Sequence, residues 1–270
     1  MKNFHLRLSK SIPFCSESFY DLLAEAKALG FDCIDFDIAG AWKDPALEES
    51  YFAHLEEGMA AVIASGLPVN CIHIPFGTRW DPCTLDEVER IKTVEKFRAI
   101  IARTAPVKPF GYIVHGSFEP NTDEEREAKI AQLKKSMREM ADATEAYLCV
   151  EVLPRTCLLN TAKEARRIIE EINIDNVRIC VDVNHFLQEK SEDGVLLLGD
   201  LIKTTHISDH DYSNERHWMP GMGKINWNAL LGAFEKIGYK GAFNYELTAP
   251  LADIKANYEA LFAAYNASKE

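Results

Sequence analysis

The segment VRICVDVNH, residues 177–185, places an acid and a histidine directly after a run of strand-forming apolar residues. An acidic, turn-like stretch follows it. A short β-rich run that ends in polar residues is typical of a strand, with Asp182 at its end and His185 already in the loop.

Similar β-rich runs recur along the chain, separated by longer amphipathic segments. We expect eight strands: Asn3 to Leu8, Phe31 to Asp37, Pro68 to His73, Phe110 to His115, Tyr147 to Val152, Val177 to Asp182, Ile202 to Ile207 and Gly241 to Leu247. Strands that alternate with helices form βα units and a parallel sheet.

Helical patterns fill the gaps between these strands. Apolar residues repeat at three and four positions from Phe19 to Leu29, and Gly30 is expected to end that helix. Helices are also expected over 85–103 and 123–143, capped by Thr84 and Thr122. No Gly/Ser/Pro linker divides the chain, so we expect one domain over residues 1–270. Eight βα units in this length favour a single (β/α)8 TIM barrel, because an open doubly wound sheet usually has fewer strands.

Composition narrows the class of partner and the compartment. The chain of 270 residues has a formal net charge of −12, which disfavours nucleic acid as a partner. The N-terminus has no apolar stretch typical of a signal peptide, and no segment approaches a membrane span, so we expect no membrane partner and a cytoplasmic location. Seven cysteines without a CxxC pair indicate free thiols and no thiolate zinc site. Cys33, Cys71, Cys149 and Cys180 lie inside apolar runs and are expected to be buried.

Six consecutive strands end in an imidazole or a carboxylate. These residues are His73, His115, Glu151, Asp182, His206 and Glu246. Alone, each has an ordinary explanation, such as a hydrogen-bonded core histidine or an aspartate that forms a turn. Together they would meet at the C-terminal rim of a barrel, where active sites of this fold lie. Because burying unpaired carboxylates is costly, a bound divalent cation is expected there, with Mn²⁺ favoured and Mg²⁺, Co²⁺ or Zn²⁺ also compatible with this ligand set.

The sequence resembles the xylose isomerase-like TIM-barrel superfamily, which includes ketose 3-epimerases, hydroxypyruvate isomerases, inosose dehydratases and endonuclease IV. The resemblance spans nearly the whole chain. It rests on the following residues and motifs: His73 in CIHIPFG, His115 in IVHGSFEP, Glu151 in VEVLP, Asp182 and His185 in VDVNH, His206 in THISDH, the run PGMGKINW over 220–227 and Glu246 in NYEL.

This resemblance implies a ligand set and a reaction. In the epimerase branch, one divalent metal is held by residues that match Glu151, Asp182, His206 and Glu246. Glu151 and Glu246 would remove and return a proton next to the carbonyl of a ketose through an enediolate, with burial holding one of them protonated. His185 and Arg216 would contact substrate oxygens, and we place His73, His115, His217 and Trp218 with them in the sugar-binding pocket. The resemblance also implies a homo-oligomer.

Three alternatives remain open at this stage. A lyase that eliminates from a keto sugar, a 3-keto glycoside or an inosose would use the same residues. An endonuclease IV-like phosphodiesterase would hold three zinc ions, adding His73, His115, His185 and an Asp-x-His pair, whose nearest match is Glu215-Arg216-His217 with Glu in place of Asp. The third alternative is a barrel that binds a sugar without catalysis.

Loop residues supply further candidates for the pocket. Aromatic residues that often pack on sugar rings fall in or near the expected βα loops: Trp42, Phe76, Trp80, Phe118 and Trp218. The glycines of Pro220–Gly223 lack the spacing and the Lys-Ser/Thr pair of a phosphate-binding loop. This loop therefore does not predict a phosphorylated substrate.

Overall fold

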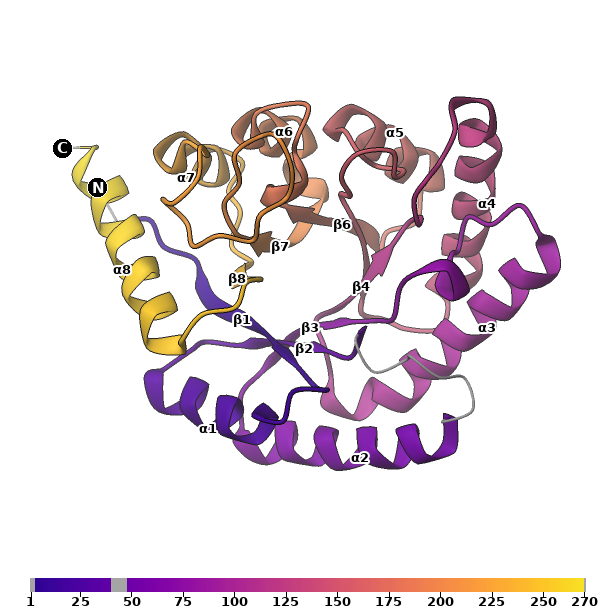
Figure 1. Cartoon of the computed structure of the whole chain (residues 1–270), viewed down its shortest axis with the longest axis horizontal. Coiled ribbons are helices and arrows are strands. Elements are labelled where there is room, and N and C mark those ends of the chain that lie inside the picture. Colours follow the sequence, from indigo (N-terminus) through magenta and orange to yellow (C-terminus); the bar gives the residue numbers. More distant parts are fainter. Residues whose placement is uncertain (1–2, 40–47, 270) are drawn as a thin grey trace.

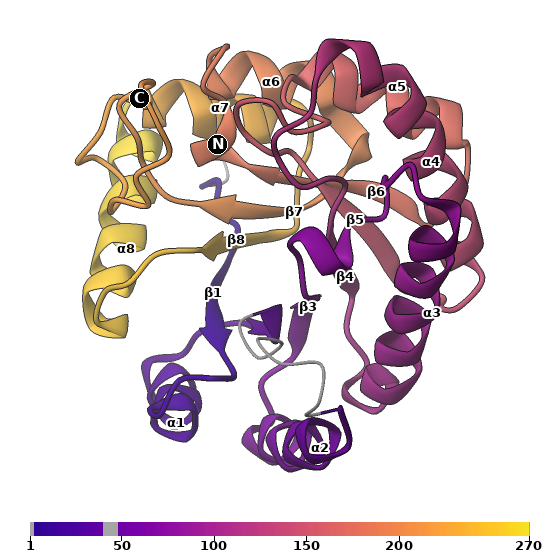
Figure 2. The ribbon, with the colours of Figure 1, turned by 45° about the vertical axis from the view of Figure 1, so that its right-hand side comes forward.

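Parallel strands close into a barrel that is surrounded by helices (Figures 1 and 2). The computed structural model describes residues 3–39 and 48–269. The described strands follow one another around the barrel in chain order: β1 (Arg7–Pro13), β2 (Ile34–Asp37), β3 (Val69–His73), β4 (Gly111–His115), β5 (Tyr147–Glu151), β6 (Val177–Asp182), β7 (Ile202–Ile207) and β8 (Ala242–Tyr245). The predicted single (β/α)8 TIM barrel is confirmed.

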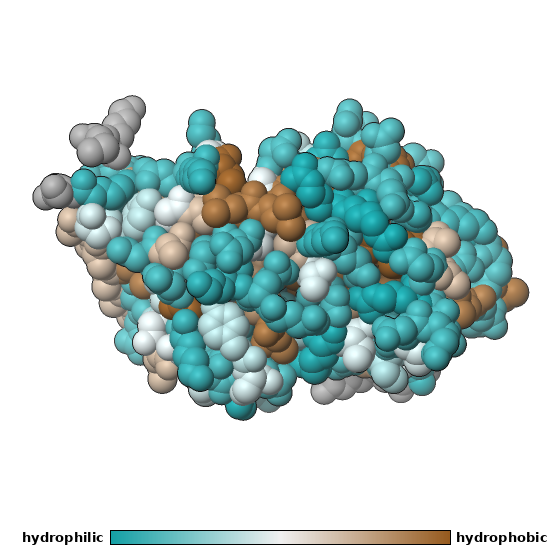
Figure 3. All heavy atoms as spheres, turned by 90° about the horizontal axis from the view of Figure 1, so that it is seen from above, coloured by the Kyte–Doolittle hydropathy of each residue, from teal (hydrophilic) through white to brown (hydrophobic). Residues whose placement is uncertain are grey.

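Helices pack outside this barrel, and their apolar faces cover the strands. The described α-helices are α1 (Phe19–Leu29), α2 (Glu48–Ser65), α3 (Glu87–Thr104), α4 (Asp123–Ala141), α5 (Ala162–Ile172), α6 (Ser191–Leu198), α7 (Trp227–Lys236) and α8 (Leu251–Ala267). The face seen in Figure 3 is mostly hydrophilic and is interrupted by small groups of apolar side chains. Among the described helices, none has the length and apolar character needed to cross a lipid bilayer.

The observed strand bounds confirm the sequence prediction for β6 and β7 and contradict it for β1. β6 and β7 span the predicted residues, but β1 begins at Arg7 and extends to Pro13 instead of spanning residues 3–8. Ser9 donates a hydrogen bond to Asn244 Oδ1 (2.8 Å), and Asn244 Nδ2 donates to Ser11 (2.9 Å). The polar stretch after Leu8 is therefore strand, because its hydroxyl groups find partners inside the barrel.

Five strands and two helices are shorter than predicted. β3, β4 and β5 are each one residue shorter, and β2 and β8 keep four residues each, Ile34–Asp37 and Ala242–Tyr245. α4 begins after its predicted cap, Thr122, whose side chain accepts from the Glu125 N–H, but the helix ends at Ala141. The prediction for α3 was wrong at its start, because Asp86 and not Thr84 accepts from the first N–H groups. α1 ends at Gly30 with φ 77°, as predicted.

Thiols occupy the barrel interior near the candidate site. All seven cysteines are free, and each except Cys15 is buried. Cys71, Cys149 and Cys180 form a small cluster with Ile113. Gly111 lies between two of these thiols: a Cβ at this position would come 3.2 Å from Cys71 Sγ and 3.3 Å from Cys149 Sγ. The thiols behave here as small buried hydrophobic groups.

Gly111→Ala is expected to destabilise the barrel by about 1–3 kcal/mol, because the added methyl group overpacks this cluster and comes 3.1 Å from the Tyr147 carbonyl oxygen. Chemical denaturation measures the change. Gly232→Ala in helix α7 is the matched control, since the atom nearest to the added Cβ would be the Tyr265 hydroxyl oxygen at an ordinary 3.5 Å. Alanine should stabilise that helix by up to about 1 kcal/mol. Equal stability of both variants and the wild type would contradict this packing.

Candidate active site

Four side chains from adjacent strands converge at the C-terminal rim of the barrel. Glu151 ends β5, Asp182 ends β6, His206 lies in β7, and Glu246 follows β8. Each offers one ligand atom, and these atoms lie within 4.8 Å of one another. His206 Nδ1 is 3.0 Å from Glu151 Oε1 and 3.1 Å from Glu246 Oε2. The set expected from sequence is thus brought together around one point.

The donor chemistry of this cluster fits a divalent cation. Glu151, Asp182 and His206 are almost completely buried, and the side chain of Glu246 is 25% exposed. Asp182 Oδ2 is buried without a hydrogen-bond partner. This donor set consists of three carboxylates and one imidazole that are largely shielded from solvent, and it is compatible with Mn²⁺, Mg²⁺, Co²⁺ or Zn²⁺. A cation here would satisfy the orphaned oxygen and offset the negative charge.

Neighbouring imidazoles control the protonation of the two glutamates. Burial alone would raise the pKa of each, but His206 and His115 hold the pKa of Glu151 well below its usual range, and His206 does the same for Glu246. We expect burial to favour the protonated form of one glutamate, but the imidazoles outweigh burial and lower the pKa of both. Burial instead raises the pKa of Asp182 to about 6.

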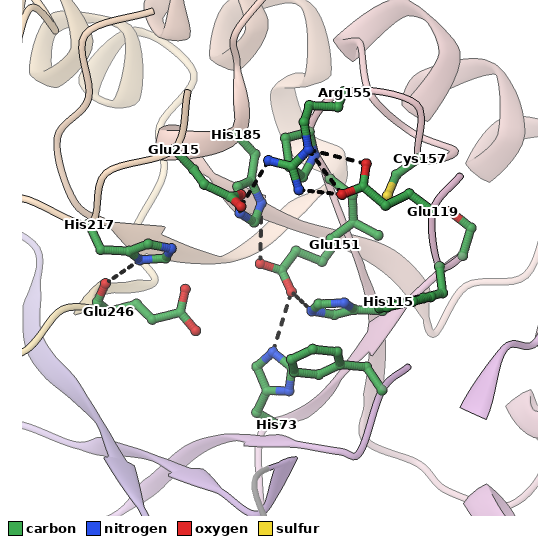
Figure 4. A pocket seen from close by; sticks show the side chains of 15 residues that line it. His73, His115, Glu119, Glu151, Arg155, Cys157, His185, Glu215, His217 and Glu246 are labelled. Atoms are coloured by element: carbon green, nitrogen blue, oxygen red, sulfur yellow. Dashed lines mark hydrogen bonds and ion pairs between the residues drawn. The ribbon is translucent and has the colours of Figure 1, made fainter. Parts of the chain in front are cut away.

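Two further groups of donor atoms flank the first (Figure 4). His115 Nε2 lies 3.0 Å and His73 Nε2 lies 3.4 Å from Glu151 Oε2, and these three side chains form a second group of donors. A third group consists of His185, Glu215 and His217, with 3.2 Å between His185 Nε2 and Glu215 Oε2. The two oxygens of Glu151 therefore face different clusters.

The loop between β7 and α7 delivers two of these donors, and Asp209 holds it in place. The Asp209 carboxylate is fully buried. It accepts from the backbone N–H groups of Gly221 (2.8 Å), Gly223 (3.0 Å) and Ile225 (3.2 Å), and from Trp227 Nε1 (2.9 Å). One carboxylate thus folds the PGMGKINW run back on β7, and Glu215 and His217 lie within the loop that it closes.

An arginine that sequence reasoning missed links three loops at the mouth. Arg155, with φ 52°, contacts Glu119 (Nη2 to Oε1, 2.5 Å) and Glu215 (Nη1 to Oε1, 2.9 Å), as Figure 4 shows. Glu215 in turn meets His185. The sequence carries no periodic signal for this network, because its members lie in three separate βα loops.

The pocket is a cavity of about 220 Å³. Its lining residues are His73, Phe76, His115, Ser117, Phe118, Glu119, Glu151, Leu153, Pro154, Arg155, Cys157, His185, Glu215, His217 and Glu246. Phe76 stacks on His115 with 4.1 Å between ring centroids and 14° between planes. One wall is therefore apolar and aromatic, and the other carries the charged donors.

Some expected pocket residues are placed elsewhere. Arg216 directs its guanidinium to Asp211 (Nη2 to Oδ2, 3.1 Å) and over the ring of Trp218, and neither Arg216 nor Trp218 lines the cavity. Trp80 is buried and stacks on Phe97. Trp42 lies outside the described residues. The structure brings together His73, His115, His185 and His217 but not Arg216 or Trp218.

Comparison with known proteins identifies the family of this chain. Residues 23–264 match a family model described as a xylose isomerase-like TIM barrel. D-psicose 3-epimerase of Ruminiclostridium cellulolyticum is 31% identical over 115 residues, which cover 40% of this chain and 38% of that relative. The matches to the D-psicose 3-epimerases thus span well under half of their length.

Longer matches have lower identity. The 3-dehydro-D-guloside 4-epimerase of Escherichia coli is 23% identical over 248 residues, covering 86% of this chain and 88% of that protein. A solved structure of a D-tagatose 3-epimerase-like protein superposes with a TM-score of 0.81 at 20% identity, over 98% of this chain and 100% of the other. That structural likeness supports the fold.

Asp209→Ala is expected to loosen the β7–α7 loop, because it removes the acceptor of the buried N–H groups of Ile225 and Trp227 and of the partly buried amides of Gly221 and Gly223. Each unsatisfied buried donor costs about 1–3 kcal/mol, so unfolding or local opening should become easier by several kcal/mol. Hydrogen exchange at the Gly221 and Gly223 amides measures this directly. Asp211→Ala is the control: this half-buried acid of the same loop accepts from the N–H groups of Ser213 and Asn214 and makes no described contact with Gly221 or Gly223. Unchanged protection of both amides in Asp209→Ala would contradict the role of Asp209.

Proposed function

Because the chain belongs to the xylose isomerase-like TIM-barrel family, we propose that it is a divalent-metal-dependent epimerase or isomerase of a ketose or related keto sugar. The observation that carries the proposal is the convergence of Glu151, Asp182, His206 and Glu246 within 4.8 Å. Curated relatives named as ketose 3-epimerases, inosose isomerases and a keto-glycoside epimerase support the reaction class.

We assign the metal to these four side chains, with Mn²⁺ preferred. When bound, a divalent cation supplies a Lewis acid that makes the hydrogen next to a carbonyl more acidic. The buried donors would hold it at the rim, and the apolar wall of the cavity would limit access of water. His185, held by the Val152 carbonyl oxygen at 2.8 Å from Nδ1, keeps its ring edge toward Asp182 and Glu215.

Glu151 and Glu246 are the proposed acid/base pair. They come from β5 and from the end of β8, both line the cavity, and His206 lowers the pKa of both. A carboxylate that is ionised at neutral pH accepts a proton from carbon, and the neighbouring imidazoles stabilise it between turnovers. One glutamate removes the hydrogen as a carboxylate and is left protonated. The other first takes a proton from solvent, returns it to the opposite face of the planar enediolate and is left ionised.

The lining of the cavity favours an uncharged sugar of monosaccharide size. Among the described lining residues, Arg155 is the single arginine or lysine, and Glu119 and Glu215 already share its charge. A phosphate or acid group would compete with both carboxylates for that guanidinium. Phe76 and Phe118 supply an apolar face of the kind that packs on sugar rings.

Glu151→Gln and Glu246→Gln are each expected to abolish turnover, because an amide neither accepts nor returns the proton. The assay is incubation with ketoses, 3-keto glycosides and inososes in D₂O, followed by mass spectrometry and NMR of the products. Solvent deuterium in an isomeric product is the expected result. Glu127→Gln, on the exposed face of α4, is the matched control and should retain activity.

Other outcomes of the same assay are informative. A dehydrated or aglycone product would replace the epimerase by the lyase, which uses the same residues. Transfer of substrate hydrogen without solvent exchange, or full activity after exhaustive chelation, would contradict the proposed mechanism.

A second candidate, an endonuclease-like phosphodiesterase with several metal ions, is favoured by one observation. Glu151 directs Oε1 toward His206 and Oε2 toward His73 and His115, and a carboxylate placed this way is able to bridge two cations. His185, Glu215 and His217 form a further donor group. The acidic net charge of −12 weighs against DNA as its substrate.

Metal stoichiometry separates the two candidates. The epimerase proposal expects about one tightly bound divalent ion per chain by elemental analysis after desalting. His217→Ala should leave that number unchanged, because His217 lies outside the four-residue cluster. Two or three ions per chain, lost in part in His217→Ala, together with hydrolysis of bis-p-nitrophenyl phosphate, would favour the phosphodiesterase instead.

A further inference from the structure

Asp35 is another buried carboxylate beneath the proposed metal centre, and it belongs to none of the donor groups described above. Asp35 of β2 is fully buried. Its Oδ1 accepts from Asn70 Nδ2 (2.7 Å) and from the Cys71 N–H (3.0 Å). Its Oδ2 has no hydrogen-bond partner, and the polar atom that faces it is His206 Nε2, 3.7 Å away. This nitrogen also has no hydrogen-bond partner.

The two ring nitrogens of His206 face different groups. Nδ1 lies 3.0 Å from Glu151 and 3.1 Å from Glu246, inside the donor cluster, whereas Nε2 is directed at Asp35. An imidazole that binds a cation through Nδ1 carries its proton on Nε2. The orphaned oxygen and the orphaned nitrogen are therefore a matched acceptor and donor, separated by slightly more than a hydrogen bond.

We infer that Asp35 is a positioning residue for the metal centre: its Oδ2 accepts the Nε2 proton of His206, fixing the ring so that Nδ1 is the ligand atom. Histidine ligands of metals commonly donate their other N–H to a carboxylate in this way. The inference rests on the proposed function, because it assigns a role toward the metal of that site.

The surroundings of Asp35 fix its orientation and offer no competing ion pair. Among the described residues, no lysine or arginine lies within 4.0 Å of its carboxylate. Asn70 donates to both Asp35 Oδ1 and Thr204 Oγ1 (2.9 Å), and it accepts from Arg7 Nη2 (3.2 Å). The Asn70 amide thus holds Oδ1 in place, and Oδ2 remains free for the imidazole. A structural aspartate would have both oxygens satisfied.

Metal affinity tests this role without reference to turnover. Titration calorimetry with Co²⁺ and Mn²⁺ compares the wild type with Asp35→Asn and Asp35→Leu, which keep roughly the volume of the side chain. Loss of such a carboxylate weakens metal binding by about 10- to 100-fold. We expect Asp35→Leu to bind most weakly and Asp35→Asn, whose amide oxygen still accepts, to lie between it and the wild type.

Thr204→Val is the matched control, since Thr204 is equally buried and contacts Asn70 but makes no described contact with His206. It should bind Co²⁺ like the wild type and keep its visible absorption spectrum, whereas the Asp35 variants should alter that spectrum. Melting curves of the metal-free proteins report on folding. A long-range ¹H–¹⁵N spectrum of the wild type loaded with Zn²⁺ should show the His206 proton on Nε2, and this measurement does not depend on any variant.

Each result decides a different claim. Two results would overturn the role of Asp35 and leave the proposed function intact. One is that Asp35→Asn and Asp35→Leu fold and bind metal with wild-type affinity. The other is that the proton of His206 lies on Nδ1 in the zinc-loaded wild type. A wild-type chain that binds no divalent ion would overturn both.

Discussion

The crowding of charged side chains at one rim of the barrel is the constraint on which the site depends. Parallel strands that close into a barrel bring all their C-terminal ends together, so Glu151, Asp182 and His206 share one nearly dry volume. Ionised carboxylates in such a place need a positive partner. The surrounding imidazoles supply part of that charge, and a divalent cation would supply the rest.

The barrel interior beneath the rim is built to support this charge. Where many barrels are filled by branched apolar side chains, the lower layers here hold a hydrogen-bonded series from Arg7 through Asn70 to Asp35. The compact cluster of buried thiols lies next to this series, with Gly111 against two of its members. The two parts of the interior meet at Cys71, whose backbone N–H donates to Asp35 Oδ1.

Sequence patterns predict the parts of this protein that obey a local rule. Strands β6 and β7 are rich in β-branched residues, and their bounds follow from the pattern. The convergence of residues such as Glu151 and Asp182 follows from strand order alone. β1 escaped prediction because Ser9 and Ser11 are strand residues only by virtue of Asn244, which lies more than 230 positions away.

Loop residues escaped prediction for a related reason. Arg155 acts through its contacts with Glu119 and Glu215, and the spacing of these residues in the sequence carries no trace of their proximity. Arg216 is a different case: the family resemblance predicts that it contacts substrate, but it does not line the cavity, and Asp211 in the same loop binds its guanidinium. Where the direction of a side chain depends on partners in other loops, only the folded chain reveals it. The two candidate functions also differ at one place, the space between Glu151 Oε2 and the imidazoles of His73 and His115. If no cation binds there, Oε2 of Glu151 can exchange a proton with carbon. If a cation binds there, both oxygens of Glu151 would serve as ligands and another residue must act as the base.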